Sequence, residues 1–247
     1  MTKIIAHRGA SLYAPENTLA SFQLAIDVGS DGIEMDVHLS KNGVPVVIHD
    51  YDVKRTTTET GYVNELTDKE LIQLDAGSWF GKKFGDQSIP LLSEVLELCV
   101  ETNDDFLINI ELKSGSTVYP QIEEKVLRIV DNLNLNDKVL ISSFDHYAIE
   151  KIKNLNEEIK TGALFSSAIV SPWRYLSTLD FDAYHTVWHR IDKEVIDGCH
   201  QNGLSINAYT LDDPNFANIL ITYGIDGIIT NDPERLLNLK KELLTHE

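Results

Sequence analysis

Carboxylates on two separate apolar segments have types and spacing that can do chemistry. Glu34 and Asp36 are two residues apart, and Glu111 stands two residues before Lys113 on a later segment. Because side chains alternate along a strand, residues two apart point to the same side. Carboxylates buried together are costly unless they are paired or bind a metal. Three of them converging from neighbouring strands predict a site for one divalent cation with oxygen ligands, Mg²⁺ or Ca²⁺.

Histidines and an arginine stand at similar places, where an apolar run meets its following loop. They are His7, Arg8 and His49. Imidazole changes charge near neutral pH and can accept or donate protons. Ordinary ion pairing at the rim, for example of Glu34 with Arg8, is the alternative explanation for any single pair. The joint occurrence of the carboxylates and both histidines favours a functional site.

Buried strands and amphipathic helices are predicted as the elements that position these residues. The strands lie near residues 4, 33, 107, 140, 161, 183, 206 and 227. Most are followed by a helix, and Asp213-Pro214 and Asp232-Pro233 are typical helix starts. Eight β/α units in 247 residues predict an α/β fold, a (β/α)8 TIM barrel that forms a single domain over residues 1–247. The alternative, a doubly wound open sheet, usually carries a glycine-rich phosphate loop, and no GxGxxG pattern is present.

Residues 51–90 interrupt the alternation. Before them, Asn42-Gly43 predicts a tight hairpin turn, and a short antiparallel strand then delivers His49. The segment itself holds one predicted helix with the capping box Thr67-x-x-Glu70. A segment this short without disulfides can hardly support its own core. We therefore predict a small insertion after the second strand that caps the mouth of the site.

The acidic composition restricts the partners. There are 39 acidic and 21 basic residues, a net charge of −18, and no basic stripe. Nucleic acid and anionic membrane surfaces would be repelled, whereas a small anionic substrate is compatible with a local metal ion and a few cations. No apolar signal segment or membrane-length apolar run is present. We expect a cytoplasmic protein without stable membrane association, and the composition leaves the oligomeric state open.

Several other conspicuous residues have structural interpretations. Cys99 and Cys199 form no CxxC pair and are predicted to be buried free thiols. The stretch after the strand near residue 161, with Pro172 and Trp173, is predicted to be irregular. Structural roles are also predicted for the remaining histidines, which are His38, His146, His185, His189, His200 and His246.

The motifs taken together resemble a known family. His7-Arg8-Gly9, Pro15-Glu16-Asn17-Thr18, Glu34-x-Asp36, His49-Asp50 and Glu111-Leu112-Lys113 resemble the glycerophosphodiester phosphodiesterase family, in its bacterial, soluble type. The likeness extends to Asp226–Thr230 and so covers nearly the whole chain. The family fold is a (β/α)8 barrel with a segment inserted after the second strand, in agreement with the predicted elements.

The resemblance implies a role for each candidate residue. The implied roles are an acid/base pair of His7 and His49, a metal site of Glu34, Asp36 and Glu111, phosphate binding by Arg8 and Lys113, and an aromatic wall at Tyr209. Many relatives have a tryptophan at this last position, so the tyrosine leaves the shape of the alcohol pocket open.

The implied activity is the metal-dependent hydrolysis of small glycerophosphodiesters to glycerol 3-phosphate and an alcohol. Cations would neutralise the charge that develops on the phosphate. One histidine would deprotonate the attacking hydroxyl and the other protonate the leaving alkoxide. The sequence leaves open which histidine does which, and whether water or the substrate's 2-hydroxyl attacks. The alternatives are a phospholipase-D-like activity on lysophospholipids and a non-enzymatic phosphodiester-binding protein, which would be expected to have lost a histidine or a carboxylate.

Overall fold

A closed barrel of parallel strands forms the centre of the computed structural model, which describes residues 1–245. Around the ring, the strands are β1 (Lys3–His7), β2 (Gly32–Leu39), β4 (Leu107–Leu112), β5 (Val139–Ser143), β6 (Lys160–Phe165), β7 (Ala183–Val187), β8 (Ser205–Tyr209) and β9 (Gly227–Thr230). The ring closes because β1 pairs in parallel with both β2 and β9. The predicted (β/α)8 barrel is confirmed. The prediction for His246 falls outside the described residues.

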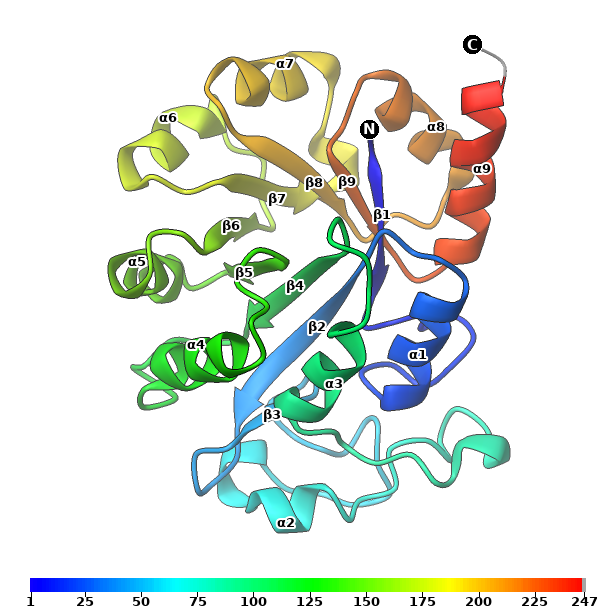
Figure 1. Ribbon diagram of the computed structural model, residues 1–247, viewed down its shortest axis with the longest axis vertical. Helices are drawn as coiled ribbons and strands as arrows, with labels where there is room; N and C mark the ends of the chain where they lie inside the picture. The colour runs from blue at the N-terminus through cyan, green and yellow to red at the C-terminus, as the bar shows by residue number, and fades with distance from the viewer. Residues whose placement is uncertain (246–247) are drawn as a thin grey trace.

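Helices surround the barrel (Figure 1). They are α1 (Leu19–Asp27), α3 (Leu92–Cys99), α4 (Ile122–Asn132), α5 (His146–Leu155), α6 (Pro172–Leu176), α7 (Lys193–Gln201), α8 (Pro214–Thr222) and α9 (Pro233–Thr245). The predicted start of α8 is confirmed, since Asp213 accepts a hydrogen bond from the backbone N–H of Asn215, and Pro214 takes the first helical position. Over residues 1–245, no helix combines the length and apolar character needed to cross a membrane.

The segment after β6 contains a helix where the sequence predicts an irregular stretch. Pro172 takes the first position of α6, where its fixed φ suits a helix. Trp173 packs against α7 at Gly198, where an added Cβ would lie only 2.2 Å from the indole ring. The prediction was wrong because a helix of five residues is too short to leave a periodic apolar pattern.

The predicted hairpin leads from β2 into the insertion. Gly43 adopts a φ of +78° in the turn, a region that glycine enters without strain. The strand β3 (Pro45–Val47) then returns antiparallel to β2. Residues 51–90 contain α2 (Asp68–Leu71) and two 3-10 turns, η1 (Val63–Glu65) and η2 (Lys82–Phe84). Their apolar side chains form a second cluster that includes Val46 and Ile48 of the hairpin, so the insertion packs on the barrel's own hairpin.

The two cysteines are free and buried, as the sequence predicts. Burial raises the pKa of the thiols of both Cys99 and Cys199 to about 12. Neither side chain is therefore a thiolate at neutral pH, and both act as small apolar residues of the core.

Candidate active site

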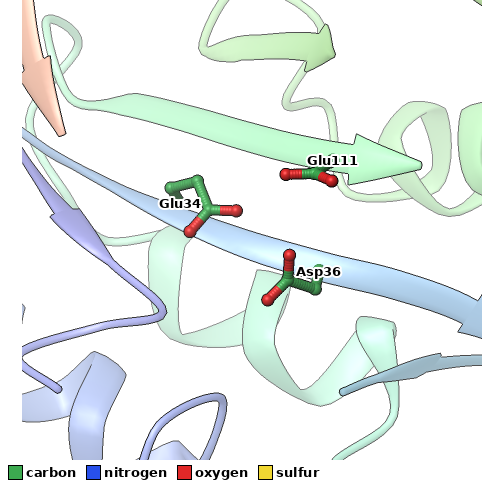
Figure 2. A group of neighbouring side chains, drawn as sticks. All are labelled: Glu34, Asp36 and Glu111. Carbon is green, nitrogen blue, oxygen red and sulfur yellow. The ribbon is translucent and has the colours of Figure 1, made fainter. Parts of the chain in front are cut away.

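The three carboxylates predicted to bind a metal come together at the carboxyl ends of β2 and β4. The strands are hydrogen-bonded neighbours, with Glu34 paired to Asn109 and Asp36 paired to Glu111. Oxygens of Glu34, Asp36 and Glu111 lie within 4.8 Å of one another, and Figure 2 shows the carboxylates turned toward one another between the strands. Their exposed fractions are only 2%, 1% and 9%, so water screens their mutual repulsion poorly. We call these three side chains the carboxylate cluster.

Two cations lie against the carboxylate cluster. Lys113 Nζ is 2.7 Å from Asp36 Oδ1 and 2.6 Å from Glu111 Oε1. Arg8 Nε is 3.2 Å from Asp36 Oδ2. Burial alone would raise the pKa of Asp36, but Lys113 and Arg8 hold it well below its ordinary value.

The other two carboxyl groups are less well compensated. Burial, together with repulsion from Asp36 and Glu111, raises the pKa of Glu34 well above its ordinary value. Burial and the charge of Asp36 raise the pKa of Glu111 to about 6. Three carboxylates thus face only two side-chain cations, so the two cations do not fully compensate the negative charge of the cluster.

The residues of the cluster fit a divalent cation. Glu34 Oε2 accepts a hydrogen bond of 2.9 Å from the backbone N–H of Arg8, whereas its Oε1 is buried without a hydrogen-bond partner. Leaving a buried acceptor unpaired is costly, and a cation between the three carboxylates would give this oxygen a partner. A set of oxygen ligands suits Mg²⁺ or Ca²⁺, whereas structural zinc sites use cysteine and histidine. The residues that would hold the cation are Glu34, Asp36 and Glu111.

His7, at the end of β1, lies beside the cluster. Its Nε2 is 4.0 Å from Glu34 Oε2, and its Nδ1 is 2.8 Å from Asn231 Oδ1. The amide is oriented by Asp212, because Asn231 Nδ2 donates to Asp212 Oδ2 at 2.7 Å. An amide oxygen only accepts, so Nδ1 of His7 carries the hydrogen and Nε2 presents a lone pair. Burial and the charge of Arg8 lower the pKa of His7 to about 4, which keeps the ring neutral at neutral pH.

His49 has a carboxylate as its partner. Its Nδ1 is 2.5 Å from Asp50 Oδ1, and Arg55 Nε donates to the other oxygen of Asp50 at 2.6 Å. The hairpin brings it to the cluster, since the backbone N–H of the preceding Ile48 donates to the carbonyl of Asp36 at 3.0 Å. Burial lowers the pKa of His49, while the charge of Asp36 and the hydrogen bond to Asp50 oppose that shift. The two histidines are thus oriented by chemically different groups, an amide and a carboxylate.

The sequence also contains site residues whose role in the site was not predicted, and Asn17 is the clearest. The neighbouring Thr18 caps α1, since its side chain accepts a hydrogen bond from the backbone N–H of Ser21. Asn17 instead adopts a φ of +56° and donates from Nδ2 to Asp36 Oδ2 at 2.7 Å. The position of Asn17 within the Pro15–Thr18 motif was the sequence feature that could have indicated this role.

Glu16, in the same motif, joins the loops around the site. Its carboxylate accepts hydrogen bonds of 2.8 Å from Arg8 Nη1 and from both Nη1 and Nη2 of Arg55. Arg55 in turn donates a hydrogen bond to Asp50, so one chain of polar contacts runs from Arg8 to His49.

No local sequence feature indicates that Asn231 is the partner of His7. Only closure of the barrel brings the loop after β9 beside β1.

Tyr209, the predicted aromatic wall, lies at the end of β8. Its hydroxyl donates to the carbonyl of Phe165 at 2.8 Å, so the hydroxyl is already engaged. Its ring meets Phe144 edge-to-face, with 6.1 Å between centroids. Burial and the charge of Glu111 raise the pKa of Tyr209. The ring is the part of this side chain that a ligand can contact.

His185 occupies the interior of the barrel. It is 1% exposed, and its Nε2 accepts a hydrogen bond of 2.9 Å from Asn207 Nδ2. Gly162 leaves the space for the ring, since a Cβ there would lie 2.6 Å from Nε2. Burial lowers the pKa of His185 to about 3.

Replacing His185 with glutamine is expected to weaken the acid sensitivity of folding. Between about pH 3 and the unfolded-state pKa of about 6.5, the unfolded chain binds a proton that the folded chain does not, so stability falls as the pH falls. Wild type should therefore lose about 2 kcal/mol more unfolding free energy than His185→Gln between about pH 7 and pH 5. Urea unfolding at both pH values measures this. The exposed His189→Gln is the matched control, and equal pH dependence of wild type and His185→Gln would contradict the expectation.

Comparison with known sequences gives relatives that match over nearly the whole chain. Residues 7–235 match the sequence profile described as the glycerophosphoryl diester phosphodiesterase family. A glycerophosphodiester phosphodiesterase of Caldanaerobacter subterraneus subsp. tengcongensis is 43% identical over 241 residues, covering 98% of each chain. One from Bacillus altitudinis is 39% identical, covering 98% of this chain and all of the relative.

Solved structures show the same fold. A phosphodiesterase from Oleispira antarctica, solved in complex with the product sn-glycerol-3-phosphate, superposes with a TM-score of 0.89 at 31% identity, covering 98% of this chain and 97% of its own. A glycerophosphodiester phosphodiesterase from Agrobacterium tumefaciens gives a TM-score of 0.83 at 31% identity, covering 95% and 98%. With a family profile that spans the site and relatives that match over almost their full length, this chain belongs to the glycerophosphoryl diester phosphodiesterase family of enzymes.

Proposed function

We propose that this protein hydrolyses glycerophosphodiesters to glycerol 3-phosphate and an alcohol, in a metal-dependent reaction with His7 and His49 as the acid/base pair. The observation that carries the proposal is the buried carboxylate cluster with Arg8 and Lys113 against it, His7 beside it at the end of β1, and His49 brought to it by the hairpin. The product bound to the Oleispira antarctica phosphodiesterase supports a phosphoglycerol ligand.

The phosphate group would be bound by Arg8 and Lys113. The Arg8 guanidinium has several N–H donors in one plane and matches phosphate oxygens, while the Lys113 ammonium supplies a compact charge. Both cations are held in place by the carboxylates before substrate arrives. Because they need not reorganise, they stabilise the charge of the transition state effectively. A divalent cation held by the carboxylate cluster would add Lewis-acid stabilisation of the same charge.

We propose different proton-transfer tasks for the two histidines. His7 is neutral with the Nε2 lone pair available, which suits acceptance of the proton from the attacking hydroxyl. Burial lowers the pKa of His49 less than that of His7, and the Asp50 carboxylate against the ring opposes the shift, so His49 is the histidine that is more easily protonated. His49 is therefore the proposed donor of a proton to the oxygen of the leaving alcohol as its bond to phosphorus breaks. Before the next turnover, His7 releases its extra proton to solvent and His49 takes up a proton from solvent.

The insertion is proposed to cap the rim of this site within a single domain. Its first residues contact the site, since the Tyr51 hydroxyl donates to the carbonyl of Lys113 at 3.0 Å and Arg55 holds both Asp50 and Glu16. The rest of residues 51–90 rests on an apolar cluster shared with the hairpin. Both contacts support a segment that is continuous with the barrel.

The test is a product analysis with glycerophosphocholine in the presence of Mg²⁺ or Ca²⁺. We expect glycerol 3-phosphate and choline in equal amounts. Release of phosphocholine and glycerol would show cleavage of the other ester bond and contradict the proposal. Including a lysophospholipid tests the phospholipase-D-like alternative, for which acyl-chain-bearing substrate would be cleaved faster than the water-soluble diester.

A further inference from the structure

A cleft lies between α5 and α6. The two helices are neighbours in the outer ring (Figure 1). The volume of the cleft is about 450 Å³. Phe144, Tyr147 and Tyr175 supply aromatic walls that are 49%, 84% and 40% exposed. Asp145 and Glu150 supply its acidic groups. We call it the aromatic cleft.

Packed aromatic residues connect the aromatic cleft to the candidate active site. Phe144 lines the cleft and packs edge-to-face on Tyr209, the last residue of β8. On the other side, Phe165 accepts the hydrogen bond of Tyr209 through its carbonyl, and its ring packs 4.7 Å from that of His146 in the cleft. The Tyr209–Phe144 contact therefore joins the end of β8 to a wall of the aromatic cleft.

The charge of the aromatic cleft is negative. Asp145 accepts hydrogen bonds from the backbone N–H groups of Gly115 and Tyr147, which hold its carboxylate at the start of α5. Glu150 follows one helical turn later, and no lysine or arginine is among the residues that line the cleft. The ring of His146 is fully engaged: its Nε2 donates to the carbonyl of Leu164 at 3.2 Å, and Nδ1 is 2.9 Å from the Tyr175 hydroxyl. Both ring nitrogens of His146 therefore already have partners within the protein.

We propose that the aromatic cleft receives the leaving alcohol of the diester and selects alcohols that carry a positively charged ammonium group. Aromatic faces attract such cations, quaternary ones especially, and the two carboxylates add to that attraction. A neutral polyol gains neither interaction, and an anionic headgroup is repelled. This inference rests on the proposed function and adds the headgroup class to it.

The test compares two substrates that share the phosphoglycerol group and differ in the alcohol. Glycerophosphocholine carries a quaternary ammonium, and glycerophosphoglycerol is neutral at the corresponding position. For the wild-type enzyme we expect kcat/KM to favour the cationic substrate about tenfold or more, in line with one desolvated cation–aromatic contact and a nearby charge. Glu150→Gln and Phe144→Leu should each reduce kcat/KM for glycerophosphocholine about threefold to thirtyfold and leave that for glycerophosphoglycerol within twofold.

Glu157→Gln removes an exposed acidic group beyond the other end of α5 and is the matched control for the loss of one negative charge. It should leave the ratio of the two kcat/KM values unchanged. Equal rates of the wild type on both substrates, or an equal loss on both in Glu150→Gln and Phe144→Leu, would overturn the headgroup assignment and leave the proposed function standing. Hydrolysis of neither diester would overturn both.

Discussion

Replacing His7 or His49 with glutamine is expected to lower kcat/KM for glycerophosphodiesters by about 10²–10⁴-fold, the usual contribution of one positioned acid or base. Glutamine can keep a hydrogen bond to the orienting partner, Asn231 or Asp50, but it cannot carry a proton to or from the substrate at neutral pH. Initial rates of glycerol 3-phosphate release measure the loss.

The pH profile separates a proton-transfer role from a structural one. If His7 is the base, His7→Gln should flatten the acidic limb of the kcat/KM profile, and His49→Gln should flatten the basic limb. His200→Gln is the control, because His200 pairs with Asp226 at the start of β9, at the end of the barrel away from the cluster. Near wild-type rates in either His7→Gln or His49→Gln would refute the proposed acid/base pair.

Removing divalent cations with a chelator is expected to abolish activity, and returning Mg²⁺ or Ca²⁺ is expected to restore it and raise Tm. The physical reason is that the cation compensates the buried repulsion among Glu34, Asp36 and Glu111. A ligand at a hundredfold excess over its Kd adds about 2.7 kcal/mol, which for a chain of this size is about 5–11 °C in Tm. Thermal unfolding with and without each metal measures the shift.

Glu34→Gln is expected to raise Tm when metal is absent and to weaken the increase in Tm that metal produces. Without metal, it removes one of three mutually repelling carboxylates, so its Tm should exceed that of chelated wild type. With metal, it lacks one ligand, so the added cation should raise its Tm much less. Glu123→Gln is a matched control, because Glu123 is equally buried but pairs with Lys151 away from the cluster. It should lower Tm with and without metal by the same amount. A full metal response in Glu34→Gln would exclude Glu34 as a ligand.

The architecture, and the residues proposed for most of the candidate site, could be predicted from local sequence features. Apolar runs alternating with amphipathic segments specify a (β/α)8 barrel because parallel strands covered by helices must be apolar on both faces. The two-residue spacing of Glu34 and Asp36 placed them on one side of β2 for the same elementary reason. Asn42-Gly43 similarly predicted the hairpin that carries His49 to the cluster.

Relations between distant segments were decided by the tertiary structure. The pairing of Asp36 with Glu111 depends on the register of β2 against β4, across the inserted residues 51–90. The hydrogen bond from His7 to Asn231 exists only because β9 closes the ring on β1. The short helix α6 carries no pattern of its own, yet it completes the aromatic cleft beside Tyr209. Local patterns encode which side of an element a residue faces, whereas the identity of its neighbour follows from barrel closure and strand register, to which the whole chain contributes.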